Sequence, residues 1–469
     1  MRDVHSSPKT RRAMDSATVI IVNYNGAHLL PACLEGLACQ QEDGPTFRTV
    51  VVDNASADDS RDVLARDYPW VHVIASDTNL GFAAGNNLAL RQVTTPFAVL
   101  LNNDAVPEPG WLRHLLAPFD TSGGEQIGMT TGKVHFLPKF AELSLAAPAV
   151  VHSAADPRDL GVKVRGLKVD GTDVFNQAVW EGVAWHLERK GRQRFRWTKP
   201  TGDLLVPLPP SLADATGALV RDVCIELRVK AERDKTLTLG CGGRVETVTV
   251  GPVTRLVEFV VPKGTYLIDI INNAGNIILT NGCGGDRGYR EVDRGQYDEP
   301  VEVFAACGNG MAMRTEVGRQ LGFFDDDYFM YYEDMDLSWR LRALGWSIHY
   351  VPDAVVRHVH AASSVEGSRL FTFNVDRNRL LTLTKNAPAS VAAVEVFGFM
   401  FAYARLLLCK PGGKQALSYA SLQNRNLARR VVRSYVRLLP RILQRRCSLR
   451  RAATVAPDRV FTAWSVSSR

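Results

Sequence analysis

Four short apolar runs in the first hundred residues restrict most strongly how this chain can fold. Each run is rich in β-branched residues and ends in polar ones, and amphipathic helical patterns follow the first two. Such runs are typical of buried parallel strands. Their alternation with helices predicts a doubly wound α/β sheet. The four runs are residues 18–22, 49–52, 71–74 and 97–101.

Polar residues gather where the predicted strands end. Asn23 and Asn25 follow the first run, Asp53 and Asn54 close the second, and the sequence Asn-Asn-Asp at 102–104 closes the fourth. Ligands of open α/β sheets bind at this edge. The first turn contains neither a GxGxxG nor a GxxxxGK[ST] motif, which argues against an NAD enzyme and a P-loop ATPase.

Two of these polar residues are acids, Asp53 and Asp104. Asp53 could accept hydrogen bonds from a nucleobase or ribose, but capping of the next helix explains it equally well. Asp104 follows Asn102 and Asn103, so this turn offers one carboxylate to a metal. That is a small ligand set for Mg²⁺ or Mn²⁺, although such ions keep several waters and bind phosphate oxygens of the substrate.

A second acidic motif lies at residues 323–340. Glu333, Asp334 and Asp336 stand in the first turn of a predicted helix that Gly345 ends. The helix dipole would stabilise any acid there. Six aromatic residues crowd the same acids, however. Aromatic walls around a few carboxylates are typical of a sugar-binding cleft, because they exclude water and raise carboxylate basicity. The pattern favours a functional cleft.

A strand is predicted at residues 348–360, shortly after the acids. Its His358 and His360 project to the same face, because alternate residues of a strand do so. Histidine pairs on strands are more often structural than metal-binding. Their place after the acidic motif nevertheless favours one of them as a partner of Asp104 in a metal site.

The chain changes character between residues 136 and 299. Short alternating or β-branched segments are separated by Gly, Pro and Asp turns, which predicts an antiparallel β-sandwich inserted into the α/β domain. Trp180, Trp185 and Trp197 lie in its first part. Exposed tryptophans would stack on sugar rings, but packing in the core is the more common reason for such residues.

The last part of the chain, residues 386–469, is predicted to be helical and basic. No Asp or Glu occurs between residues 401 and 451, whereas arginines alternate with an apolar stripe. A basic amphipathic helix suits an anionic membrane surface. No base-stacking aromatics are interleaved with the arginines, so we expect no nucleic-acid partner. The apolar window at 391–408 carries Glu395 and Arg405 and is marginal for a membrane span.

Residues 1–16 lack an apolar segment typical of a signal peptide. The eight cysteines form no CxxC pair, which argues against a zinc site and suits reduced thiols. We therefore expect a cytoplasmic protein that is peripheral on the inner face of the cell membrane.

Together these motifs resemble the inverting, metal-dependent glycosyltransferases of family 2, which have a GT-A fold, and especially the rhamnosyltransferase-like and galactofuranosyltransferase-like members. The resemblance implies a GT-A doubly wound mixed sheet formed by residues 17–135 and 300–385, an inserted β-sandwich at 136–299, and a basic helical tail at 386–469. The matching motifs are residues 19–25, 51–56, 79–87, 100–104, 329–340 and 351–358.

The resemblance also implies roles for the matched residues. Asp334 corresponds to the catalytic base, with Glu333 and Asp336 contacting the donor or acceptor sugar. Asp104 corresponds to a ligand of Mn²⁺ or Mg²⁺, and His358 to the histidine that completes that site. Asn102 stands where the family has an acid. The nucleotide sugar is expected at Asn23, Asn25, Asp53, Asn54, Asn79, Gly81, Asn86, Asn102 and Asn103, and the acceptor at Gly308, Asn309, Tyr332 and Trp339.

The implied activity is inverting transfer of a rhamnose-like or galactofuranose-like sugar from a nucleotide diphosphate to a hydroxyl of a cell-envelope or lipid-linked glycan. A sugar-phosphate nucleotidyltransferase is one alternative, but it should have a glycine-rich basic loop after the first strand. A carbohydrate-binding protein with a degenerate transferase domain is another, and the presence of Asp104, Asp334 and His358 argues against it. The sequence leaves the sugar, nucleotide, linkage and oligomeric state open.

Overall fold

A computed structural model describes residues 15–41, 44–153, 156–191, 193–214, 216–359, 367–408 and 419–467. The chain divides into two compact units. Unit 1 comprises residues 1–135, 272–289 and 295–469, and unit 2 comprises residues 136–271 and 290–294.

Unit 1 is built on a ten-stranded mixed sheet with the order β22-β24-β6-β23-β4-β1-β2-β3, to which β19 and β5 are attached. The first four strands pair in parallel, and β23 pairs antiparallel with β4. The predicted mixed α/β sheet is therefore confirmed. The strands are β1 (Ala17–Asn23), β2 (Phe47–Asn54), β3 (His72–Ser76), β4 (Phe97–Leu101), β5 (Ala105–Pro107), β6 (Ile127–Phe136), β19 (Ile271–Asn273), β22 (Val301–Glu302), β23 (Gly310–Arg314) and β24 (Ser347–His358).

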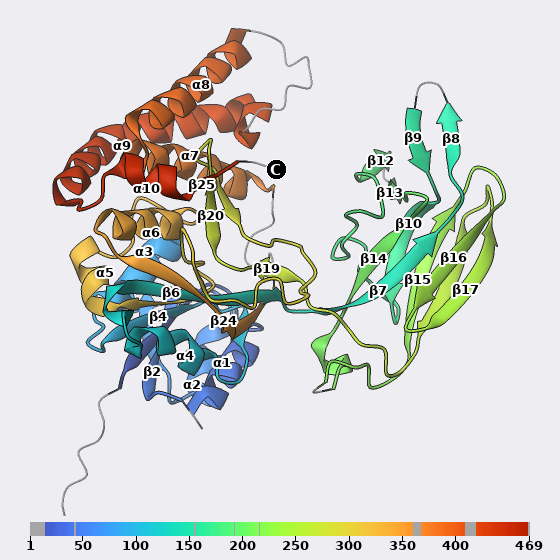
Figure 1. Ribbon diagram of the computed structural model, residues 1–469, viewed down its shortest axis with the longest axis horizontal. Coiled ribbons are helices and arrows are strands. Elements are labelled where there is room, and N and C mark those ends of the chain that lie inside the picture. The colour runs from blue at the N-terminus through green and yellow to red at the C-terminus, as the bar shows by residue number, and fades with distance from the viewer. Residues whose placement is uncertain are drawn as a thin grey trace, which may run out of the picture. The chain divides into compact units, whose positions relative to one another are not determined.

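Helices cover both faces of this sheet (Figure 1). On one face, Leu34 and Trp111 belong to a buried cluster with the strand residues Ile21, Val51 and Val99. Helices α3, α5 and α6 lie on the other face. The helices are α1 (Leu30–Ala38), α2 (Ser60–Asp67), α3 (Gly81–Leu90), α4 (Trp111–Leu116), α5 (Thr315–Leu321) and α6 (Glu333–Ala343), with 3-10 turns at Cys39–Gln41, Ala117–Asp120 and Gly124–Gln126.

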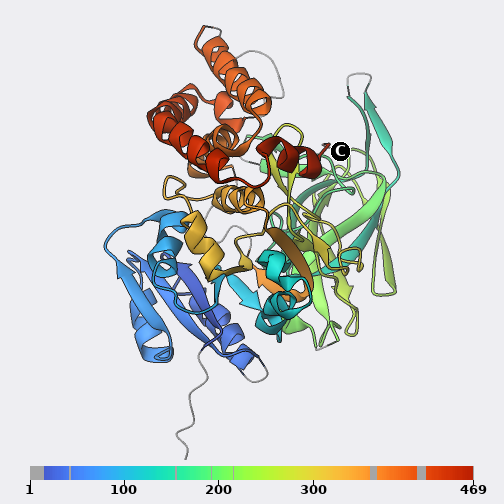
Figure 2. The same ribbon diagram turned by 60° about the vertical axis from the view of Figure 1, so that its left-hand side comes forward.

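Four further helices complete unit 1 as a layer beyond α6 (Figure 2, orange to red). They are α7 (Arg369–Asn386), α8 (Ala389–Leu408), α9 (Arg425–Ala452) and α10 (Pro457–Trp464), with a 3-10 turn at Ala420–Gln423. The expected tail at 386–469 thus belongs to unit 1 and forms no unit of its own. The reason is that α9 buries Val431 and Tyr435, and the Tyr435 hydroxyl lies 2.8 Å from Thr384 Oγ1 of α7.

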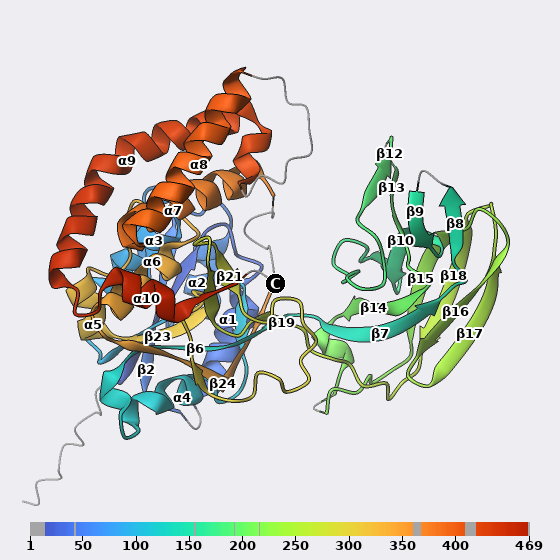
Figure 3. The same ribbon diagram turned by 45° about the horizontal axis from the view of Figure 1, so that its top comes forward.

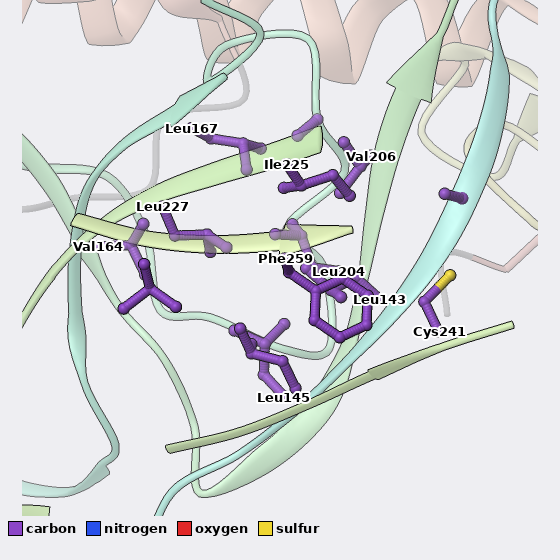
Figure 4. Packing of buried hydrophobic residues seen from close by; sticks show 14 of the residues in the cluster. Leu143, Leu145, Val164, Leu167, Leu204, Val206, Ile225, Leu227, Cys241 and Phe259 are labelled. Atoms are coloured by element: carbon purple, nitrogen blue, oxygen red, sulfur yellow. The ribbon is translucent and has the colours of Figure 1, made fainter. Parts of the chain in front are cut away.

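Unit 2 consists of antiparallel sheets with the orders β12-β13-β10-β15-β18, β14-β7-β16-β17 and β8-β9. The first two share one core, in which Leu143 and Leu204 from one sheet lie with Ile225, Leu227 and Phe259 from the other (Figure 4). The strands are β7 (Lys139–Ala146), β8 (Val150–Ser153), β9 (Asp156–Leu160), β10 (Lys163–Val169), β11 (Thr172–Asp173), β12 (Glu188–Lys190), β13 (Gln193–Trp197), β14 (Thr201–Leu208), β15 (Val223–Lys230), β16 (Lys235–Cys241), β17 (Arg244–Val250) and β18 (Arg255–Val261), with a 3-10 turn at Pro210–Leu212.

Trp180 and Trp197 are buried, which agrees with the expectation that packing in the core is the more common reason for such residues. The boundaries of the insert differ from the expectation. Residues 272–289 and 295–299 belong to unit 1, although the sequence places them in the insert. The apolar run at 266–273 reads as one more strand of the insert, but its end forms β19, which pairs with β6 of the large sheet. Strands β20 (Asn276–Leu279) and β21 (Gly284–Asp286) follow, and β20 pairs with β25 (Ser465–Val466).

A buried ion cluster joins α6 to α7. Asp336 is fully buried and accepts hydrogen bonds from Arg340 Nε at 2.8 Å, Lys385 Nζ at 2.9 Å and Asn386 Nδ2 at 2.8 Å. Lys385 also donates to Asp325 at 2.6 Å. Burial alone would raise the pKa of Asp336, but the Lys385 and Arg340 cations outweigh it and lower that pKa to about 2.

We expect Asp336→Asn to lower the free energy of unfolding by about 3–5 kcal/mol, because it leaves two buried cations undercompensated. Denaturant titration followed by tryptophan fluorescence measures this loss. The control is Asp67→Asn, which removes the exposed Arg66–Asp67 pair and should change the free energy of unfolding little, because solvent screens such a pair. Equal losses in both variants would contradict the account.

Low pH should weaken the same buried ion cluster. The pKa of Asp336 is lowered in the folded state, so its contribution to stability is complete above about pH 4, the value of an unfolded aspartate. The contribution is lost as pH falls through that range toward 2. In Asp336→Asn, this part of the acid dependence should be missing.

Candidate active site

The loop before α6 has an unusual backbone. Phe323, Tyr331 and Tyr332 have φ values of 58°, 70° and 68°. Bulky residues rarely adopt positive φ, and each instance costs about 1–3 kcal/mol unless the surroundings enforce it. Asn378 of α7 provides part of that enforcement, because its Nδ2 donates to the carbonyls of Met330 at 2.9 Å and Tyr331 at 2.7 Å.

Gly81 holds the other side of this loop. Its φ is +77°, and a Cβ built on it would lie 2.2 Å from the carbonyl oxygen of Phe329. The next amide, Phe82 N, donates to that same oxygen at 2.6 Å. The start of α3 and the loop before α6 can therefore meet only if residue 81 has no side chain.

This loop delivers Glu333 and Asp334 to the first turn of α6 as a carboxylate pair. Asp334 Oδ2 accepts from Gly308 N and Asn276 Nδ2, both at 3.3 Å, and its Oδ1 accepts from Met335 N at 2.7 Å. Burial raises the pKa of Asp334 to about 6, against these hydrogen bonds. Burial, together with the neighbouring Asp334, raises the pKa of Glu333 well above its usual value.

The pair differs from the surrounding acids in having no cation. Asp325, Asp327 and Asp336 pair with Lys385 or with arginines of α6 and α9, and Asp326 pairs with Arg91. Within the described residues, neither Glu333 nor Asp334 has such a partner, and Glu333 Oε2 is buried without any hydrogen bond. Two carboxyls with raised pKa values in a cleft indicate acid–base chemistry.

A cavity of about 450 Å³ opens over this pair within unit 1. It collects residues from the turn after β4, the end of β24, the loop before α6 and the β20–β21 region. Predicted site residues that line it are Asn102, Asp104, Gly308, Asn309, Tyr332, Glu333, Asp334 and His358. Residues 272–289 add Asn272, Asn276, Asp286 and Tyr289. The Asn-rich run at 272–276 is the only sequence signal that could have identified this second group.

Asp104 and His358, the predicted metal ligands, lie side by side in this cavity. Their Oδ1 and Nε2 atoms are 3.1 Å apart, and both side chains are buried. Despite this distance, Asp104 Oδ1 lacks a well-directed hydrogen bond. An orphaned carboxylate oxygen beside an imidazole nitrogen fits a divalent cation. No cluster of three or more such ligands occurs in the described part of the chain, so waters or a ligand would supply the rest.

Asn309 lies between Asn102 and His358. Asn102 Nδ2 donates to Asn309 Oδ1 at 2.5 Å, and Asn309 Nδ2 lies 3.5 Å from His358 Nδ1. The structure thus places Asn309, predicted at the acceptor, against the predicted metal ligand. His360 lies outside the described residues.

The remaining strand-end residues form a second group, away from the cavity lining. Asp53 is fully buried; its Oδ2 accepts from Arg61 Nε at 2.5 Å, while its Oδ1 has no partner. Asn23 and Asn103 lie nearby, because Asn23 pairs with Asp53 in the strand register and Asn103 Nδ2 donates to Asn23 Oδ1 at 2.8 Å. Asp53 Oδ1 is thus a buried carboxylate oxygen without a hydrogen-bond partner in the described part of the chain.

Four other predicted nucleotide contacts shape the loops themselves. Asn25 Oδ1 accepts from Ala57 N at 2.7 Å. Asn54 Nδ2 donates at 3.1 Å to both Asn79 Oδ1 and the Gly81 carbonyl, and Asn86 Nδ2 donates to the Phe82 carbonyl at 2.9 Å. These amides are engaged within the protein.

Among the residues predicted for catalysis and for the acceptor, two are not brought to the cavity. Asp336 is held in the buried ion cluster with Lys385 and Arg340. Trp339, expected at the acceptor, is 1% exposed. It packs edge-on against Phe304 and stacks on Phe461, with ring centroids 5.5 and 6.1 Å away. Both lie on sides of α6 that face other helices or the sheet, so the structure gives them packing roles.

Comparison with known families finds two matching segments. Residues 18–135 match the model described as glycosyl transferase family 2, and residues 278–375 match that of glycosyltransferase-like family 2. The second segment begins inside the region that the sequence assigned to the insert.

Curated relatives match shorter stretches. N-acetylglucosaminyl-diphospho-decaprenol L-rhamnosyltransferase of Mycobacterium tuberculosis is 46% identical over 76 residues, which cover 16% of this chain and 24% of that protein. Teichoic acid poly(glycerol phosphate) polymerase of Staphylococcus epidermidis is 32% identical over 95 residues, 19% of this chain and 13% of that one. The chain thus spans about a quarter or less of these relatives.

Solved structures with similar chains include mannosyltransferase PcManGT from Pyrobaculum calidifontis in complex with GDP-Man and Mn²⁺, with a TM-score of 0.39 and 14% identity. That match covers 93% of this chain and 85% of the other. For S. aureus TarS 1–349, the TM-score is 0.38, the identity 13%, and the coverage 94% and 87%.

We expect Gly81→Ala to destabilise the chain more than Gly123→Ala. Both glycines have positive φ, so both variants pay about 1–2 kcal/mol for the left-handed backbone. Only the Cβ at position 81 meets a carbonyl oxygen, whereas nothing lies within 4 Å of a Cβ at position 123. Denaturant unfolding of the two variants measures the difference, and equal losses would show that the Gly81–Phe329 contact does not restrict the loop.

Proposed function

Residues 18–135 and 278–375 of this chain belong to glycosyltransferase family 2, and we propose that the protein is an inverting, metal-dependent hexosyltransferase. It moves a rhamnose-like or galactofuranose-like sugar from a nucleotide-diphosphate donor to a hydroxyl of a cell-envelope or lipid-linked glycan. The observation that carries this proposal is one cavity in which an unpaired carboxylate pair and the Asp104–His358 pair meet.

Asp334 is the catalytic base in this proposal. Its carboxylate takes the proton of the acceptor hydroxyl as that oxygen bonds to the anomeric carbon and the bond to the diphosphate breaks on the opposite side. The donor configuration is thereby inverted. A pKa of about 6 suits a base that works near neutral pH. Gly308 N and Asn276 Nδ2 orient the carboxylate toward the acceptor.

Glu333 has a different task. Burial and the neighbouring Asp334 raise the pKa of Glu333 well above its usual value, which favours its neutral form. A neutral carboxyl can donate a hydrogen bond to a sugar hydroxyl, and it adds no negative charge beside Asp334. In this proposal Glu333 binds a sugar hydroxyl, and its neutral form leaves the Glu333–Asp334 pair with one negative charge.

The donor would be held at two places. Asp53 Oδ1, buried and without a partner, accepts a hydrogen bond from the nucleobase or ribose. Asp104 and His358 would hold Mn²⁺ or Mg²⁺, which when bound stabilises negative charge on the diphosphate leaving group as a Lewis acid. Gly308 and Tyr332 line the cavity together with Asn272, Asn276 and Tyr289, and in this proposal they face the acceptor. Asn309 lies beside His358 and belongs to the donor side.

We further assign unit 2 as an inserted β-sandwich, and the helices from residue 386 onward as the part that associates with an anionic membrane surface from the cytoplasmic side. The L-rhamnosyltransferase of M. tuberculosis, whose printed name gives a decaprenol-linked substrate, supports a lipid-linked acceptor.

We expect Asp334→Asn to reduce transfer by at least about 10²-fold, because general-base catalysis contributes about 10²–10⁴-fold. Binding of UDP or dTDP with Mn²⁺, measured by calorimetry, should remain. The rate of the unsubstituted enzyme should fall as pH drops through about 6, where Asp334 becomes protonated. Transfer at near the original rate in Asp334→Asn would remove the base assignment.

We expect Asp104→Asn and His358→Ala each to weaken Mn²⁺-dependent binding of UDP or dTDP by about 10-fold or more, since each removes one of only two protein ligands. Titration of Mn²⁺ at fixed nucleotide measures this. His72→Ala removes an exposed histidine on β3 and serves as the control. Unchanged Mn²⁺ dependence in both site variants would rule out this metal site.

A further inference from the structure

Helix α8 presents an apolar face that none of the described residues of unit 1 covers. Val394, Phe397, Phe401 and Leu408 are 70%, 73%, 67% and 86% exposed. Their spacing of three, four and seven residues places them along one stripe of the helix. The helix is long and apolar enough to cross a membrane by length and composition, yet almost none of its apolar window is buried in the protein.

The opposite face of α8 is fixed to the protein. Phe399 is buried and packs edge-on against Tyr419, with centroids 4.8 Å apart. Glu395, the one acid of the helix, accepts from Arg379 Nη2 at 2.6 Å and from the Tyr419 hydroxyl at 3.1 Å. The acid is thus turned inward. The outward stripe carries no negative charge, and a crossing of the bilayer would break this ion pair.

Helix α9 packs beside α8 and supplies positive charge (Figure 3). Arg429, Arg433 and Arg437 recur every four residues and are exposed. They have no ion-pair partner in the part of the chain that the structure describes, whereas Arg441 and Arg445 pair with Asp327. Val436 lies on the same side and is 54% exposed. Helix α9 contains no acid to offset these arginines.

We propose that α8 lies in the plane of an anionic lipid surface, with its Val394–Phe397–Phe401–Leu408 face in the boundary between headgroups and acyl chains. The arginines of α9 contact the headgroups. An apolar stripe flanked by cations is the pattern of an interfacial helix. The inference rests on the membrane association proposed above, and it names α8 as the segment that inserts.

The test is co-sedimentation of the full chain with vesicles of phosphatidylcholine containing phosphatidylglycerol. We expect F397D/F401D to lower vesicle binding by about tenfold or more, because two charges must enter the interface. The control V245D/V253D places the same charges at exposed valines of unit 2 and should bind like the unsubstituted chain. R429Q/R433Q/R437Q should lose the preference for anionic vesicles and the salt dependence of binding.

Calorimetric binding of UDP or dTDP with Mn²⁺ shows whether each variant keeps a folded donor site, so failure here is distinguishable from failure of the transferase proposal. Vesicle binding by F397D/F401D equal to that of the control would overturn the proposal. Protein that resists extraction from vesicles by alkaline carbonate would also overturn it, because α8 would then span the bilayer. So would a dimer that F397D/F401D converts to a monomer without any change in vesicle binding, because a second copy would then cover this face.

Discussion

The unequal sharing of cations among the acids around α6 is the constraint on which the rest of the site depends. Lys385 contacts both Asp325 and Asp336, and Arg445 contacts both Asp325 and Asp327. No cation from the described segments contacts the Glu333–Asp334 pair. Because burial disfavours charge wherever no cation offsets it, the same helix turn holds one carboxyl with a lowered pKa and two with raised pKa values. Within four residues, Asp336 thus stabilises the fold, whereas Glu333 and Asp334 are placed for acid–base chemistry.

The strained loop before α6 positions the two kinds of carboxylate differently. Tyr331 and Tyr332 keep the left-handed conformation because two contacts restrict the loop. Asn378 donates hydrogen bonds to its carbonyls, and Gly81 packs closely against Phe329. That turn aims Glu333 and Asp334 into the cavity while Asp336, farther around the helix, points toward Lys385. Asp104 and His358 reach the same cavity from the ends of neighbouring chain segments, since β5 after Asp104 pairs with the end of β24 at His358.

The sequence predicted those parts of the fold and site that depend on local patterns. Apolar runs with polar ends define the parallel strands and place Asp104 at the end of one of them. The choice of His358 as its partner came from the resemblance to the family, because the strand pattern alone left His358 and His360 as alternatives. Sequence patterns could not show which acid of α6 faces the cavity, because the orientation of Asp336 depends on Lys385, which is 49 residues away. Asn276 was also missed. The apolar, β-branched run at 266–273 reads as a further strand of the insert, whereas residues 272–289 belong to unit 1.

The central claim is that a metal-binding pair and an unpaired carboxylate pair share one cavity. Anomalous diffraction from crystals grown with Mn²⁺ and UDP or dTDP tests it most directly. The account predicts a manganese peak bound by Asp104 and His358, with the carboxylate of Asp334 facing the same cavity. A nucleotide-bound crystal with manganese held by other residues, or with Asp334 turned into the protein, would contradict it.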